Sequence, residues 1–389
     1  MISENRALFQ PGTIGKLKIS NRFIASSISY RDADQYGFPS DSEQDHIRRL
    51  ARGRVGLIIP GYMYTSKSGR TRIWQLGMSS SVHADAWKDV IDDVHKLGSK
   101  IILQIAHGGI ASSTELIKGV PKGPSAIIPK TQQMTIADIE QVIQSYVKAA
   151  KRLMQAGADG IEIQCGHGFL LSQFLSPFLN KRHDGYGGSI ANRARIVKEI
   201  VEEIRKVKTY DEFAIIAKIN GDDSIKKGGM TPSMCGQTVN ILSKAGVDLF
   251  EITSGLISPW NIIRGKRKED FEDFDHPLFH QHLRGNYMDT DFVEGYNVES
   301  LKKIREMNPN ASFSVVGGHR HLEKMEDLVK NQITDYVSLG RPLLKDPFLV
   351  ERFYSGKATE SDCDNCNICY MNPPYMSVHC PKSQVLPLV

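Results

Sequence analysis

Residues 160–189 read GIEIQCGHGFLLSQFLSPFLNKRHDGYGGS, and this stretch sets the pattern for the whole chain. It opens with an apolar run that is typical of a buried strand and ends in a glycine-rich turn. Two polar side chains, Gln164 and His167, stand where the strand ends. The stretch therefore predicts one strand of an α/β sheet that delivers polar groups to its carboxyl end.

The same unit recurs along the chain. Between the strands lie amphipathic stretches such as residues 137–158, 192–207 and 325–333, with apolar residues at helical spacing. Eight strand–helix repeats predict a (β/α)8 TIM barrel. A doubly wound sheet is the competitor, but no GxGxxG follows the first strand. The other strand candidates are residues 22–29, 56–63, 100–108, 213–221, 249–255, 312–318 and 335–344.

Three segments lie outside this repeat. Residues 7–21 predict a small N-terminal hairpin that covers the lower end of the barrel. Residues 258–296, charged and aromatic, predict a long loop after the sixth strand, on the catalytic face, and a candidate lid. We expect a barrel domain over residues 1–354 and a cysteine-containing C-terminal extension over residues 355–389.

Composition excludes several classes of protein. Lys and Arg number 49 and Asp and Glu 44, a net charge of +5 over 389 residues, and no basic block reads as a nucleic-acid arm. The N-terminus lacks the apolar core of a signal peptide. No apolar run reaches the roughly 20 residues that span a bilayer. We expect a cytoplasmic protein that binds neither nucleic acid nor membrane.

The seventh and eighth strands end in glycine. VVGGH (315–319) and LGRPLL (339–344) each precede a helical pattern, which places glycine amides at two adjacent helix starts. Backbone N–H groups at a helix start bind phosphate, and an arginine adds a bidentate contact. Tight turns alone would explain one such glycine site, but two neighbouring loops with an arginine favour a phosphate site. Its residues are Gly317, Gly318, Gly340 and Arg341.

Two further strand residues predict a polar ligand. Lys218 lies within the apolar run FAIIAKING, where an inward lysine is costly unless it meets an anion or polar ligand. The alternative is outward snorkelling between helices; alternation favours the inward position. Gln104 offers a donor and an acceptor, which suits the edge of a pyrimidine ring.

Residues 160–201 resemble the signature of the old yellow enzyme family, the NADH:flavin oxidoreductases. Further matches occur in the family's order: NRFIASSIS (21–29), GLIIPGYMY (56–64), LQIAHGG (103–109), PSAI (124–127), AKING (217–221) and VVGG with VSLGRPLLKDPF (315–348). The resemblance implies a barrel that holds FMN at its mouth. It also implies hydride transfer from NAD(P)H, through FMN, to a small electrophile such as an activated alkene, quinone or nitro compound.

Carried over residue by residue, the resemblance implies a flavin site. Ser26 and Ile28 contact the flavin through backbone atoms, Ser29 tunes it near O4, and Tyr62 touches its polar edge. Gln104 binds the pyrimidine edge, Lys218 stands beside N1 and O2, and the glycines and Arg341 named above hold the phosphate.

The sequence departs from the family at the pair of side chains that polarise the oxygen of the electron acceptor, which we call the acceptor clamp. His167 is retained, but Gln164 replaces the usual His, and the tyrosine that donates a proton is Phe169. Loss of a general acid typically costs about 10²–10⁴-fold in rate. Two functions therefore stay open: a reductase of electrophiles that need less from that acid, or a flavin-binding protein with weak or no ene-reductase turnover. Tyr30, Tyr62 or the loop could supply another proton donor.

Four of the six cysteines crowd the C-terminus, and in a cytosolic chain they indicate thiols or metal ligands rather than disulfides. Larger relatives of the 2,4-dienoyl-CoA reductase type carry a four-cysteine [4Fe–4S] motif after the barrel, with wider spacing than here. An iron–sulfur cluster, a zinc ion and free thiols remain alternatives. The oligomeric state is not predicted. The four are Cys363, Cys366, Cys369 and Cys380.

Overall fold

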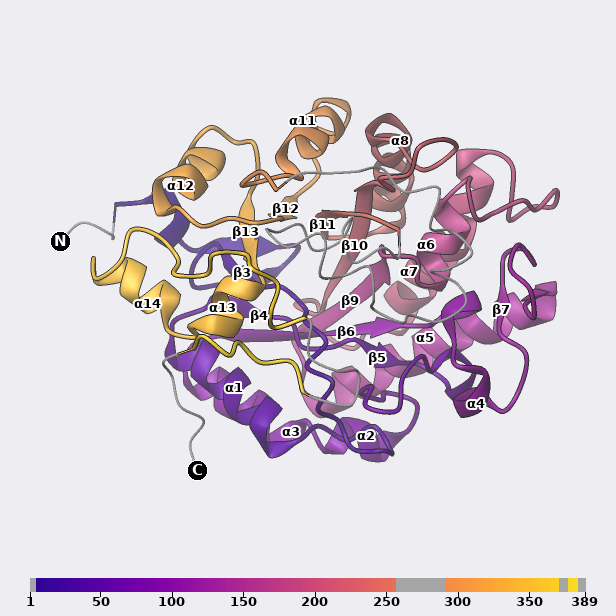
Figure 1. The fold of residues 1–389 in the computed structure, drawn as a ribbon, viewed down its shortest axis with the longest axis horizontal. Helices are drawn as coiled ribbons and strands as arrows, with labels where there is room; N and C mark the ends of the chain where they lie inside the picture. Colours follow the sequence, from indigo (N-terminus) through magenta and orange to yellow (C-terminus); the bar gives the residue numbers. More distant parts are fainter. Residues whose placement is uncertain (1–4, 257–291, 371–376, 384–389) are drawn as a thin grey trace.

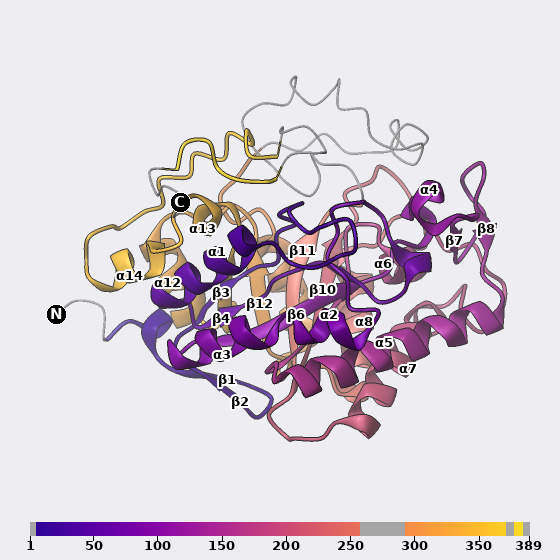
Figure 2. The ribbon, with the colours of Figure 1, turned by 90° about the horizontal axis from the view of Figure 1, so that it is seen from below.

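The computed structural model describes residues 5–256, 292–370 and 377–383. Its centre is a ring of parallel strands, closed by the pairing of β13 with β3 and of β4 with β6 (Figures 1 and 2). The (β/α)8 TIM barrel is therefore confirmed. The ring strands are β3 (Phe23–Ala25), β4 (Leu57–Ile58), β6 (Lys100–Ala106), β9 (Gly160–Cys165), β10 (Ala214–Asp222), β11 (Leu249–Ser254), β12 (Phe313–Val316) and β13 (Tyr336–Leu339).

Helices surround the ring and bury their apolar faces against it (Figure 1). The helix α5 (Ile136–Ala156) begins at a capping box, in which Thr135 and Asp138 satisfy each other's backbone N–H groups. It ends at Gly157, whose φ of +86° suits glycine. The others are α1 (Asp41–Arg52), α2 (Ser81–Asp85), α3 (Lys88–Lys96), α4 (Thr114–Ile117), α6 (Leu170–Leu175), α7 (Ile190–Val207), α8 (Pro232–Ala245), α11 (Val298–Met307), α12 (Leu322–Lys330), α13 (Arg341–Lys345) and α14 (Leu349–Tyr354).

The predicted N-terminal hairpin is present as β1 (Gly12–Ile14) and β2 (Leu17–Ile19), which pair antiparallel. Its apolar side chains join a buried cluster with inward residues of the barrel strands, so the hairpin closes the lower end of the ring. Short strands β5 (Met63–Tyr64), β7 (Lys122–Gly123) and β8 (Gln132–Gln133) lie in the connections.

Inward side chains of the barrel form two layers. The lower layer is apolar and includes Ile24, Ile102 and Ile216. Two residues further along each of these strands, the inward side chain is polar. Because side chains alternate across a strand, residues two apart share a face, and the polar layer stands directly above the apolar one. Its members are Ser26, Gln104, Glu162, Lys218, Glu251, Ser314 and Ser338.

Most of the predicted loop over residues 258–296 lies outside the described residues. The described part of the C-terminal extension hydrogen-bonds to the barrel: Leu322 N–H donates to the Thr359 carbonyl at 2.9 Å, and Val378 N–H donates to the Tyr30 carbonyl at 2.7 Å. The division into residues 1–354 and 355–389 stays a prediction. No helix among the described residues is long and apolar enough to cross a membrane.

Aspartates tie neighbouring strands together at the lower end of the barrel. Asp159, Asp248 and Asp335 each precede a strand, and each accepts a hydrogen bond from the backbone N–H of an adjacent strand. Each also pairs with a basic side chain, which comes from the helix that precedes the adjacent strand. The partners are Ile101 and His95 for Asp159, Ile215 and Arg205 for Asp248, and Phe313 and Arg305 for Asp335.

Replacing Asp159 with Asn should lower the free energy of unfolding by about 1.5–3 kcal/mol at pH 7, the usual worth of hydrogen bonds to a buried charged group. Burial alone would raise the pKa of Asp159, but His95 and the Ile101 N–H lower it overall. The stabilisation is therefore complete above the unfolded Asp pKa of about 3.9 and is lost as the pH falls through the lower folded pKa. Urea unfolding at several pH values measures both effects. Asp92→Asn, on the exposed side of α3, is the matched control, and equal losses in both variants would contradict the prediction.

Candidate active site

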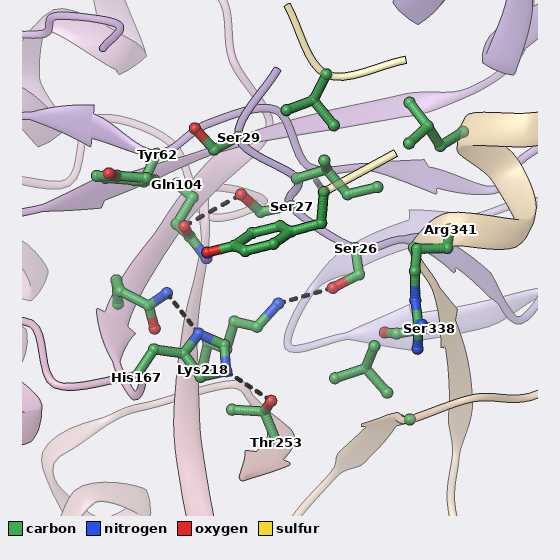
Figure 3. Close-up of a pocket in the computed structure, with 18 of the residues that line it drawn as sticks. Ser26, Ser27, Ser29, Tyr62, Gln104, His167, Lys218, Thr253, Ser338 and Arg341 are labelled. Carbon is green, nitrogen blue, oxygen red and sulfur yellow. Dashed lines mark hydrogen bonds between the residues drawn. The ribbon is translucent and has the colours of Figure 1, made fainter. Parts of the chain in front are cut away.

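A cavity opens at the carboxyl ends of the barrel strands, where TIM-barrel active sites lie. Figure 3 shows strand-end side chains that point into it from opposite sides of the ring. The structure brings together in this cavity the residues that the sequence singled out for flavin binding and for the acceptor clamp. They are Ser26, Ile28, Ser29, Tyr62, Gln104, Gln164, His167, Lys218, Gly317, Gly318, Gly340 and Arg341.

Lys218 forms part of the floor of the cavity. It points into the barrel rather than outwards, and it is 3% exposed. Its Nζ donates a hydrogen bond to Ser26 Oγ at 2.7 Å and lies 2.9 Å from Glu251 Oε2 (Figure 3). The barrel thus holds a buried ammonium group at the base of the cavity.

Gln104 lies beside Lys218 with its amide held in one orientation. Its Nε2 donates to Glu162 Oε2 at 2.6 Å, and its Oε1 accepts from Ser27 Oγ at 3.1 Å. A carboxyl oxygen that carries no proton accepts and a hydroxyl can donate, so this network assigns the amide nitrogen and oxygen.

His167 and Gln164 converge as the sequence predicted, and the backbone makes this possible. His167 adopts a left-handed φ of +58°, and its N–H donates to Asn220 Oδ1 at 3.1 Å. The ring nitrogens lie 3.4 Å from Gln164 Nε2 and 2.8 Å from Thr253 Oγ1. Burial, with the Lys218 cation nearby, lowers the pKa of His167 to about 3. The imidazole is therefore neutral at physiological pH, and each side chain can donate a hydrogen bond without charge.

Phe169 packs against Tyr62, with ring centroids 4.6 Å apart. The Tyr62 hydroxyl lies 2.9 Å from Thr71 Oγ1. Tyr62 therefore brings a phenol to the same wall of the cavity as Phe169. Tyr30 packs instead against Leu344 and Cys369, and burial raises its pKa. Of the two tyrosines considered from sequence, Tyr62 is the one that lines the cavity.

The predicted phosphate end differs in part from the expectation. Gly340 does cap a helix, α13, but α12 begins at Leu322, so Gly317 and Gly318 lie in the loop before it rather than at a helix start. Their φ values of +153° and +72° are ones that side chains rarely adopt. Arg341 points into the cavity (Figure 3). It also hydrogen-bonds Asn367 of the extension.

The four C-terminal thiols gather above the barrel, and Cys369 reaches the cavity. Burial raises the pKa of Cys369 to about 12, against the effect of Arg341, and the other three thiols add to the rise. Among the described residues, no three His, Cys, Asp or Glu side chains form a group that could hold a metal ion. The geometry therefore gives the iron–sulfur or zinc prediction no support.

Sequence reasoning missed part of the cavity wall. Arg31 and Arg72 both line it, and Arg31 lies over the ring of Tyr370, 5.1 Å from its centroid. Tyr370 belongs to the extension, so no strand pattern marks it. Thr253, which holds His167, could have been found, because it lies two residues beyond the inward Glu251 on the sixth strand.

Comparison with known proteins shows which family has this fold and sequence. Residues 7–360 match the NADH:flavin oxidoreductase / NADH oxidase family. An NADPH dehydrogenase of Clostridium acetobutylicum is 30% identical over 348 residues, which cover 88% of this chain and 93% of that protein. An NADH oxidase of Thermoanaerobacter brockii is 29% identical, over 93% of this chain and 53% of that protein. A solved 2-naphthoyl-CoA reductase, in complex with 2-naphthoyl-CoA, has a TM-score of 0.79 at 25% identity, over 93% of this chain and 54% of that chain.

A barrel with this cavity and this family match defines a flavin-dependent oxidoreductase. The chain belongs to the NADH:flavin oxidoreductase / NADH oxidase family, the old yellow enzyme family. It is an FMN-dependent enzyme that passes hydride from NAD(P)H to small substrates.

The neutral state of His167 has a measurable consequence. Between its folded pKa of about 3 and the unfolded value of about 6.5, only the unfolded chain is protonated, so His167 makes stability fall with falling pH. In His167→Asn, the slope of unfolding free energy against pH between 5.5 and 4 should be smaller by about 1.4 kcal/mol per pH unit. Urea unfolding of His183→Asn, which alters an exposed histidine, is the control. Identical slopes in wild type and His167→Asn would contradict the prediction.

Proposed function

We propose that the flavin ring lies with its pyrimidine edge on Gln104 and Lys218 and its phosphate at Arg341 and the loops that contain Gly317, Gly318 and Gly340. The observation that carries this proposal is the position of the Lys218 ammonium, which lines the cavity together with the oriented amide of Gln104. When bound, FMN supplies the hydride transfer. Lys218 stabilises the negative charge that collects at the adjacent ring edge.

Ser26, Ile28, Ser29 and Tyr62 complete the proposed flavin site from neighbouring strand ends. Ser26 is already aligned, since its hydroxyl accepts from Lys218 and its N–H donates to the Leu339 carbonyl at 3.0 Å. Ser29 lies on the same segment, two residues beyond Ser27, which holds Gln104.

The acceptor, we infer, is held by its oxygen between His167 and Gln164. Both groups are uncharged donors, so they polarise an acceptor oxygen without supplying a proton. Phe169 has no proton to give. This set suits quinones and nitro compounds better than simple enones, because an enone needs a proton at carbon. Tyr62, which packs on Phe169, brings a phenol to this wall of the cavity.

Arg341→Ala tests the phosphate position. A charge-assisted hydrogen bond contributes about 1.5–3 kcal/mol. Its loss should therefore raise the Kd for FMN at least tenfold. Titration of apoprotein with FMN, followed by flavin fluorescence, measures it. Lys303→Ala, an exposed change on α11, should leave the Kd unchanged. An apoprotein that binds no FMN would contradict the proposal as a whole.

The second function, a flavin-binding protein with little turnover, is favoured by Gln164 and Phe169. Stopped-flow mixing separates the two. Rapid bleaching of bound FMN by NADH or NADPH, followed by rapid reoxidation with a quinone or nitroaromatic, supports the reductase. Slow bleaching with both nucleotides supports the binding protein.

Phe169→Tyr restores a phenol on the wall of the acceptor site. If proton donation limits enone reduction, kcat for a cyclic enone should rise at least tenfold, towards the lower end of the usual general-acid contribution of about 10²–10⁴. Turnover of a quinone should stay the same, because its oxygens protonate from water. Phe178→Tyr, outside the cavity, is the matched control. An unchanged enone rate would show that the proton already comes from another group.

A further inference from the structure

Two buried carboxyl groups lie in the polar layer of the barrel and take no part in the function proposed above. Glu162 is 0% exposed and Glu251 is 1% exposed. They come from β9 and β11, the strands on either side of the strand that carries Lys218. We call Glu162 and Glu251 the carboxyl pair.

Each member of the carboxyl pair contacts a different flavin-edge residue. Glu162 Oε2 accepts from Gln104 Nε2 at 2.6 Å. Glu251 Oε2 lies 2.9 Å from Lys218 Nζ, within ion-pair distance. The pair thus connects to both side chains on which the proposed pyrimidine edge rests.

The two carboxyl groups also contact each other. Glu162 Oε1 meets no hydrogen-bond donor among the described residues, whereas Glu251 interacts with the Ser338 hydroxyl and with Lys218. Two ionised carboxylates in contact inside a dry barrel repel strongly, and one proton held between them supplies the missing donor.

The charges decide which carboxyl keeps that proton. Burial and the neighbouring Glu251 raise the pKa of Glu162 well above its ordinary value. Burial alone would raise the pKa of Glu251 as well, but the Lys218 ammonium lowers it overall. Burial opposes the charge on Lys218, yet Glu251 and Glu162 together raise its pKa.

We propose that Glu162 is a protonated carboxylic acid that donates to Glu251, and that the Glu251 carboxylate balances the charge of Lys218 and so weakens its stabilisation of the reduced flavin. This rests on the proposed position of the flavin edge at Lys218. Glu162 and Glu251 act through Lys218 and Gln104, so they are positioning residues.

Substitution of Glu162 and substitution of Glu251 should affect FMN reduction differently. Reduction of FMN by two electrons and one proton leaves a negative charge at the edge beside Lys218, and a nearby carboxylate disfavours that charge. Glu162→Gln keeps a neutral donor in place. Adding Glu251→Gln to that variant removes the carboxylate and leaves no second carboxyl to replace it.

Equilibration with a redox dye of known potential measures the ratio of reduced to oxidised FMN at pH 6, far below the ordinary lysine pKa of about 10.4. The ratio in Glu162→Gln should lie within threefold of wild type. In the double variant Glu162→Gln/Glu251→Gln it should rise at least tenfold over Glu162→Gln, which is about 30 mV for a two-electron couple. Glu212→Gln, at an exposed position before β10, should match wild type.

Two outcomes would overturn the proposal: a tenfold change in the ratio of reduced to oxidised FMN in Glu162→Gln alone, or a ratio in the double variant that matches that of Glu162→Gln.

Infrared spectroscopy of the apoprotein at pH 7 gives a test that needs neither the double variant nor bound FMN. Burial raises the pKa of Glu43 to about 8, so Glu43 also contributes a carboxylic acid carbonyl band at pH 7. A second such band should be present in wild type and Glu212→Gln and lost in Glu162→Gln. A carbonyl region that is the same in wild type and Glu162→Gln would overturn the proposal even if FMN binds as proposed.

Discussion

A lysine ammonium enclosed by a ring of strands is the constraint on which the cavity depends. Burial of an isolated cation is very costly, so every group around Lys218 must offset part of that cost. Ser26, at the end of β3, accepts a hydrogen bond from Lys218, and Glu251 of β11 supplies a negative charge. The polar layer of the barrel is organised around this one charge, and the apolar layer with the N-terminal hairpin below it keeps water out.

The same charge shapes the acceptor side of the cavity. Burial and Lys218 together keep His167 neutral, so the proposed acceptor site offers two uncharged donors, His167 and Gln164. Replacement of the usual tyrosine by Phe169 then removes the proton source, while the packing of Phe169 on Tyr62 keeps the wall intact. The cofactor side and the acceptor side thus differ in character, the first charged and hydrogen-bonded, the second neutral.

The C-terminal extension is part of the cavity rather than an appendage. It brings Tyr370 against Arg31 and Asn367 against Arg341, and Cys369 reaches the wall. These residues come from a segment without helices or strands among its described residues, so their positions depend on contacts with the barrel.

Local pattern was enough to predict the barrel, its hairpin and the strand ends that line the cavity, because alternation and helical spacing report which face of each element is buried. It placed Lys218 and Gln104 inside for the same reason. It misplaced Gly317 and Gly318 at a helix start, because a glycine pair before a helical pattern does not reveal how many loop residues intervene. It assigned no role to Glu162 or Glu251. Closure of the ring decided which strand residues far apart in the chain meet, such as Lys218 and Ser26. The packing of the extension on the barrel decided the contact of Arg31 with Tyr370. Sequence spacing carries the direction of a side chain, whereas only closure of the sheet determines which distant side chain it meets.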